Sequence, residues 1–410
     1  MSDRQDERTH RVTPLELFFD LVFVFAITQV TTFLARTPTG GGLVRGMLVL
    51  AALWWAWSAY AWLTNALDPE EGAVRLAVLA AVAAMLIVSL AAPRAFGRDG
   101  VIFGVAYLVV RVLHVVLFGI ASRGDRDMRR AVLRISATAP APALLVVAGA
   151  LHGTAQLVLW GVALAILYGS PLIGHMRGMR VSPEHFVERF GLIIIIALGE
   201  SIVAIGVGAS GLKLDASVIA AALLGVTVAA CLWWSYFDWA IYATQARLAE
   251  AQGSRRSELA RDVYSYLHLP MVAGIVLFAF GLKTTLAGET RSLATVPAIG
   301  LCGGLALYVL AHVAVRLRLG GGLGRGRPIA TLVLLAMIPV ATLVPALAAL
   351  AIVAAICVVL IAYEVLRHRT SRAWIRDHRG ADFTLDEVRQ VAEPERRPRR
   401  RRNARRTTRS

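Results

Sequence analysis

Charged residues are scarce in this sequence. Asp, Glu, Lys and Arg together make up 17% of its 410 residues, whereas hydrophobic residues make up 57% and the mean hydropathy is +0.63. Soluble domains carry about 25% charged residues. The composition therefore excludes an ordinary soluble protein and predicts an integral membrane protein.

Cysteine and catalytic motifs are also lacking. The three cysteines lie inside apolar segments with no metal-ligand or redox spacing, so we expect them to be packing residues. No His-Glu-x-x-His pair and no Gly-x-Ser-x-Gly elbow occurs. His185 stands beside Glu184 in a predicted loop and suggests no ligand face. These absences predict a protein that is not an enzyme and that has no metal or cofactor.

A cleavable secretory signal is missing as well. The first ten residues are polar, and the first apolar run is followed by no small-residue cleavage pattern. We expect that run to stay in the protein as a membrane span.

Long apolar runs dominate the rest of the chain. Each is close to the 20 residues that a spanning helix needs, and together they predict an all-α polytopic membrane protein of about twelve transmembrane helices. The runs are 15–35, 43–63, 73–92, 100–121, 134–152, 155–173, 187–209, 216–238, 266–286, 295–315, 328–345 and 347–366. The breaks within the two closest pairs are placed at Gly153 and Pro345.

Arginines are unevenly distributed over the predicted loops. With a cytoplasmic N-terminus, the inside loops collect most of them, among them Arg123, Arg126, Arg255 and Arg256. This asymmetry satisfies the positive-inside rule, so both termini are predicted to be cytoplasmic.

Paired motifs predict an internal repeat. Glu16 and Glu188 each open an apolar run shortly after a proline, with an aromatic residue two positions on. The aromatic clusters at Trp54 and Trp233, interpreted as interfacial anchors, follow at a similar offset. Two six-helix halves would then share one orientation, as parallel repeats. The predicted domains are residues 1–14, 15–181, 182–366 and a basic disordered tail at 367–410.

Three motifs give a family resemblance. They are Glu16-Leu-Phe-Phe-Asp-Leu-Val-Phe-Val, then Glu188-Arg-Phe-Gly with Ala197-Leu-Gly-Glu200-Ser, and Trp233-Trp-Ser-Tyr-Phe-Asp238. In this order, over roughly residues 11 to 366, they resemble the bacterial low temperature requirement protein A (LtrA) family. The resemblance implies a polytopic protein of the bacterial plasma (inner) membrane that is linked to growth in the cold and has no established biochemical activity.

Carboxylates in the apolar runs are the first candidates for an ion or substrate site. Glu16 and Asp20 share one face of the first helix, and Glu200 lies about 18 Å beyond Glu188 along its helix. An ionisable group at membrane depth is a functional candidate by default. The structural alternatives are a helix-dipole role for Glu16, an arginine partner for Asp20 and a buried ion pair for Glu200.

Arg111 is the one arginine near the middle of a predicted span. An ion pair with Asp20 or Glu200 is the favoured interpretation, and recognition of an anionic substrate group is the alternative. His268, in a segment to which the resemblance extends, completes the primary set. The secondary candidates are Tyr107, His114, Glu188, Arg189, Ser201 and Asp238. Glu188 and Arg189 are expected at the cytoplasmic mouth as a solvated or gating ion pair.

These groups favour a secondary transporter or ion-conducting protein for an unknown small solute or ion. The Phe18-Phe-Asp20 helix is also similar to the Phe-Ser-Asp helix of the lysosomal potassium channel family, which suits a cation pathway. Two alternatives stay open: an intramembrane enzyme acting on lipid, and a non-catalytic membrane scaffold. The tail, with 15 arginines in its last 44 residues, is expected to lie on anionic lipid headgroups rather than to bind nucleic acid.

Overall fold

The computed structural model describes residues 12–67, 69, 71–173, 179, 181–288, 290–367 and 369, apart from the side chains of residues 134 and 239. Within these residues all regular elements are helices, and a single isolated antiparallel bridge joins Ser292 to Pro345. Apart from Arg367 and Arg369, the predicted tail lies outside the described residues. The all-α fold predicted from composition is confirmed.

Among the described residues, the first half of the chain forms seven α-helices and one short 3₁₀ turn. Their bounds are α2 Pro14–Arg36, α3 Gly40–Thr64, α4 Gly72–Ala91, η1 Ala92–Arg94, α5 Gly100–Ala121, α6 Arg126–Ser136, α7 Pro140–Gly149 and α8 Gly153–Ile173.

The described part of the second half adds further α-helices and three π-helical turns. Their bounds are α9 Pro183–Ala209, α10 Ala216–Ser235, η2 Tyr236–Ala240, α11 Ile241–Glu250, α12 Gly253–Ala260, η3 Arg261–Leu267, α13 His268–Leu286, α14 Thr295–Ala298, η4 Ile299–Gly303, α15 Gly304–Arg318, α16 Gly326–Ala341 and α17 Ala346–Arg367.

Ten helical stretches among the described residues are long and apolar enough to cross a membrane. Two further apolar helices, α7 and α16, are shorter. The multi-pass membrane class is therefore established, while the total of twelve spans stays a prediction that depends on these two helices.

The predicted span 134–152 is wrong as a single helix. The structure divides it, because α6 ends at Ser136 and α7 begins at Pro140. A proline lacks the backbone N–H and crowds the preceding turn, so a helix starts at it more readily than it runs through it. The break at Gly153 is as predicted: α8 starts there, and its φ of +68° suits glycine.

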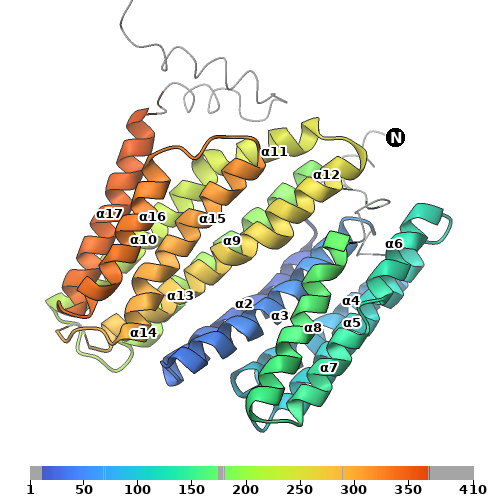
Figure 1. Cartoon of the computed structure of the whole chain (residues 1–410), viewed down its shortest axis with the longest axis horizontal. Helices are drawn as coiled ribbons and strands as arrows, with labels where there is room; N and C mark the ends of the chain where they lie inside the picture. Colours follow the sequence, from blue (N-terminus) through green and yellow to red (C-terminus); the bar gives the residue numbers. More distant parts are fainter. Residues whose placement is uncertain are drawn as a thin grey trace, which may run out of the picture.

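Helices pack in the same pairs in both halves. In the first, α4 contacts α2 and α5, α5 contacts α7, and α8 contacts α3. In the second, α13 contacts α9 and α15, α15 contacts α16, and α17 contacts α10. The two groups lie side by side, the first in blue to green and the second in light green to red (Figure 1). This pairing is what a six-plus-six duplication predicts, and the duplication itself stays a prediction.

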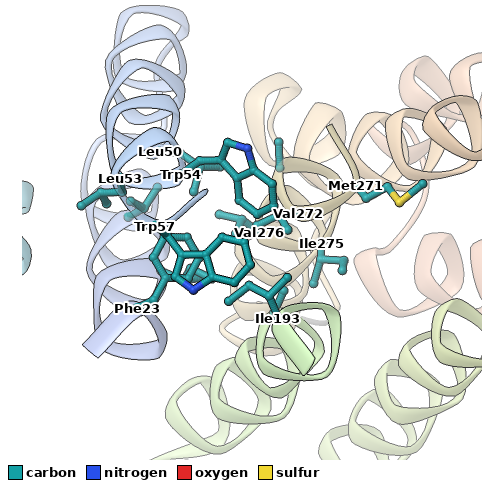
Figure 2. Packing of buried hydrophobic residues seen from close by; sticks show 14 of the residues in the cluster. Phe23, Leu50, Leu53, Trp54, Trp57, Ile193, Met271, Val272, Ile275 and Val276 are labelled. Atoms are coloured by element: carbon teal, nitrogen blue, oxygen red, sulfur yellow. The ribbon is translucent and has the colours of Figure 1, made fainter. Parts of the chain in front are cut away.

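The two groups meet along α2, α3, α9 and α13. Trp54 and Trp57 of α3 are fully buried there, against Ile193 of α9 and Val272 of α13 (Figure 2). The interpretation of the Trp54 cluster as an interfacial anchor is therefore wrong. The sequence shows the cluster of aromatic residues, but it does not show which helices cover them. Trp233, in contrast, is 46% exposed.

Candidate functional site

The site starts at the first turn of α2. The Thr13 hydroxyl accepts a hydrogen bond from the backbone N–H of Glu16 at 3.3 Å, and the Thr13 N–H donates to Glu16 Oε2 at 2.9 Å. This reciprocal capping box, with Pro14 at the first helical position, fixes the start of the helix. It also holds the Glu16 carboxylate near the end of the span.

Arg189 of α9 joins Glu16 and Asp20. Its guanidinium lies 3.1 Å from Asp20 Oδ2 and 3.7 Å from Glu16 Oε1, and all three side chains are 1% exposed. The Trp57 indole N–H donates to Asp20 Oδ1 at 2.8 Å, and Arg189 lies over the Trp57 ring at 5.8 Å. One arginine thus links the two carboxylates of α2 to α9 and α3.

His185 completes this cluster. Its Nε2 lies 3.2 Å from each carboxylate oxygen of Glu16, and its side chain is buried on the first turn of α9. The sequence reading of His185 as a loop residue is wrong. Pro183 at the helix start was the available signal, because it moves the beginning of α9 ahead of His185.

The partner predicted for Asp20 is also wrong. Asp20 pairs with Arg189, which was expected to be solvated at the mouth, and not with Arg111. Glu188, the neighbour of Arg189, does lie at the exposed end, where its carboxylate accepts a hydrogen bond from the Val12 N–H at 3.2 Å. Consecutive residues of an α-helix point about 100° apart, so Glu188 faces outward while Arg189 is buried.

Glu200 is 2% exposed and has hydroxyl partners. The Thr28 hydroxyl of α2 lies 2.5 Å from Glu200 Oε2, and Thr31 is a second hydroxyl close by. Lys283 of α13 interacts with it electrostatically, but within the described part of the chain Glu200 forms no ion pair. Neither Arg111 nor Arg189 neutralises it.

Thr28 and Glu200 occupy equivalent positions in the two halves of the predicted repeat. The two residues are 172 positions apart, which is also the offset between Glu16 and Glu188. Residues at equivalent positions of two parallel repeats touch only close to the axis that relates them. Under the predicted duplication, Glu200 therefore lies near the centre of the molecule, where repeat-built carriers place their sites.

Arg111 and its neighbours lie away from this cluster. Arg111 is 5% exposed and donates to the Thr138 hydroxyl at 3.2 Å. Tyr107 donates to the Ala52 carbonyl at 3.1 Å, and His114 Nε2 lies 3.0 Å from the Ala59 carbonyl. The hydrogen-bond partners of these three residues do not include Asp20 or Glu200.

The remaining candidates, His268, Ser201 and Asp238, lie elsewhere in the helix bundle or beside Glu200. His268 is 2.9 Å from the Tyr236 hydroxyl through Nε2 and 2.8 Å from the Val263 carbonyl through Nδ1, so both of its nitrogens have partners. Ser201 is fully buried next to Glu200, and Asp238 lies in the π-helical turn η2. Among the described residues, no three His, Cys, Asp or Glu side chains gather as a metal site would need.

The fold and these buried charges define the class of the protein, a polytopic α-helical integral membrane protein with polar groups between its helices. Within that class the family is shown by sequence: the profile of the bacterial low temperature requirement A protein (LtrA) matches residues 11–362, and the chain belongs to this family.

The chain also resembles a protein of a bacterium. The chain is 32% identical over 289 residues to the uncharacterized protein RA0937 of Rhizobium meliloti (strain 1021), and the match covers 66% of this chain and 69% of the relative. No solved structure matches significantly.

Proposed function

We propose that this protein is a secondary transporter or ion-conducting protein in which Glu200 takes up and releases a proton or small cation. The observation that carries the proposal is a carboxyl group buried between α2 and α9 with hydroxyl partners in place of an arginine. A carboxyl group that only stabilised the fold would gain more from an ion pair, because an uncompensated buried charge is costly.

The Thr28 hydroxyl supports proton exchange at this position. It lies 2.5 Å from Glu200 Oε2 and 3.2 Å from the Val24 carbonyl, and it has one proton to donate. With Glu200 ionised, Thr28 donates to the carboxylate. With Glu200 protonated, the acid donates to the Thr28 oxygen and Thr28 turns its proton to Val24. Rotation of one hydroxyl thus serves both states.

The Glu16, Asp20 and Arg189 cluster has a different role in this proposal. It joins α2 to α9 at the end of the spans where both helices begin. A buried cluster at the mouth of the same interface holds the two helices together on one side while Glu200 exchanges its ion. Movement of α9 against α2 would open or close the path, as one repeat rocks against the other.

The remaining parts of the proposal come from the sequence and the family. Arginine-rich loops favour cytoplasmic termini and the bacterial inner membrane, and the family links the protein to growth at low temperature. The tail would rest on anionic lipid, and no enzymatic step is proposed.

Flux through reconstituted liposomes tests the role of Glu200. Pure protein should conduct protons or cations down an imposed gradient, read by a pH-sensitive or cation-sensitive dye inside the liposomes. Glu200→Gln removes the exchangeable proton and keeps the size of the side chain, so flux should fall to the level of protein-free liposomes. Thr28→Val keeps the carboxyl group and should leave slower flux.

The matched control is Glu71→Gln, because Glu71 is exposed and makes no side-chain cap hydrogen bond at the start of α4. It should conduct as the unchanged protein does. Equal flux through folded Glu200→Gln protein would contradict the proposal.

A further inference from the structure

We propose that a cavity in the first half of the molecule binds an amphiphilic oxyanion: a carboxylate or phosphate group attached to an apolar chain. The cavity has a volume of about 100 Å³ and is partly open to the outside. It is formed by α3, α5, α6 and α8 together with η3 and the break between α6 and α7. The proposal stands whether or not Glu200 carries an ion.

The charge on the cavity wall comes from Arg111. Its Nη2 donates to Thr138, while Nη1 is buried without a hydrogen-bond partner. No ion pair of Arg111 is formed with any residue that the structure describes. A guanidinium buried without a counter-charge is unfavourable, and it matches carboxylate and phosphate oxygens in a bidentate way. The unpaired donor is therefore best explained by an anion that binds there.

A second arginine on the wall already has partners within the protein, one of them a carboxylate that it shares with Arg318. Arg261 of η3 forms an ion pair with Asp262 at 2.6 Å and donates to the Pro171 carbonyl at 2.8 Å. These contacts satisfy Arg261 within the protein. Arg111 accordingly remains the charged group on this wall that a ligand would meet, and a single negative group is expected.

The rest of the wall is mainly apolar. Trp55, Trp62, Phe118 and Leu167 line it. A water molecule needs about 10–15 Å³ of such space, so the cavity admits a group several times larger. A bare inorganic anion would leave these aromatic surfaces without contacts. A ligand with an apolar chain next to its charged group would contact both Arg111 and the apolar residues of the wall.

Hydrogen bonds hold the aromatic part of the wall in place. The Trp62 indole N–H donates to the Ser265 hydroxyl at 2.8 Å, and the Ser58 hydroxyl donates to the same oxygen at 3.0 Å. Ser265 lies in the π-helical turn η3, and such turns are frequent at functional sites. Under the predicted duplication His312 takes the position of Arg111 in the second half, so an arginine at this position belongs to the first half alone.

Quenching of tryptophan fluorescence tests this site, because Trp55 and Trp62 line it. Protein in nanodiscs of zwitterionic lipid is titrated with ω-bromoundecanoate, whose bromine quenches an indole on contact. We expect saturable quenching. Arg111→Gln should weaken binding about tenfold to hundredfold, the usual effect of losing a charged hydrogen bond. Ser170→Phe fills the cavity, keeps every charge and should weaken binding equally.

The control variant is Arg75→Gln, which changes an exposed arginine of α4 and should bind as the unchanged protein does. Unchanged binding in both cavity variants would overturn the proposal. If ω-bromoundecanol binds as tightly as ω-bromoundecanoate, the site does not need an anion. If inorganic phosphate binds as tightly, the site does not need the apolar chain. Competition by phosphatidylglycerol in the nanodisc would identify a lipid headgroup as the natural anion. If phosphatidylglycerol does not compete, the natural anion is a water-soluble amphiphile. Both results agree with the site.

Discussion

Arg189 holds two carboxylates of another helix in a site where all three side chains are almost completely buried. Such a cluster contributes little net stability compared with apolar residues, but removal of one member leaves charges without a partner. The pairing also fixes the registry of α2 against α9, since the cluster joins the first two turns of both helices.

At this scale we predict that Arg189→Met destabilises the protein. Glu16 and Asp20 would remain as buried like charges, so the free energy of unfolding should fall by about 3–5 kcal/mol. Denaturant unfolding in detergent micelles measures it. Arg75→Met, at an exposed position, should change little, and the double variant with Asp20→Asn should recover part of the loss. An unfolding midpoint equal to that of the unchanged protein would refute this role.

The elements pack closely where small residues allow it. A Cβ on Gly104 of α5 would lie 2.6 Å from Val146 Cα of α7, and one on Gly149 would lie 2.3 Å from the Gly100 carbonyl carbon. These contacts are with backbone and cannot be relieved by a side-chain rotation. Close packing of small residues is a usual source of helix association in membranes. It holds the short helix α7 against α5, and with it the turn that carries Thr138.

We therefore predict that Gly104→Ala separates α5 from α7 and lowers the unfolding free energy by about 1–3 kcal/mol, the usual cost of overpacking. Gly161→Ala on α8 is the matched control, because nothing lies within 4 Å of its added Cβ. It should be neutral or slightly stabilising. The same detergent unfolding assay compares the two, and a smaller loss for Gly104→Ala than for Gly161→Ala would contradict the packing argument.

On the scale of the whole molecule, the parallel repeat depends on an even number of spans in each half. In the first half this number depends on whether α6 and α7 together cross the membrane, since neither is long enough alone. The loops on either side of them therefore report the topology.

We predict opposite accessibility for these loops. In a protein with Cys231, Cys302 and Cys357 replaced by Ala, a membrane-impermeant maleimide added to intact cells should label His152→Cys. Arg123→Cys should be labelled only after permeabilisation. Both positions are exposed on the protein, so accessibility depends on the membrane side. Labelling of both positions from one side would exclude the crossing and the parallel orientation of the halves.

The sequence by itself determined the membrane class, the helical fold, most helix positions and the family, because apolar length, helix caps and short motifs are properties of neighbouring residues. It also identified Glu16, Asp20 and Glu200 as buried carboxylates, since their place in apolar runs is visible without a fold. The break between α6 and α7 was missed because hydropathy averages across Pro140, although the proline itself was readable.

Only the tertiary structure decided which groups meet. Asp20 is 169 positions from Arg189, and Thr28 is 172 from Glu200, so these pairs depend on where α2 crosses α9 and on the rotation of each helix about its axis. The same geometry buries Trp57 against Asp20 and leaves Arg111 facing a cavity. A sequence shows that a buried charge needs a partner, but the partner is selected by helix packing.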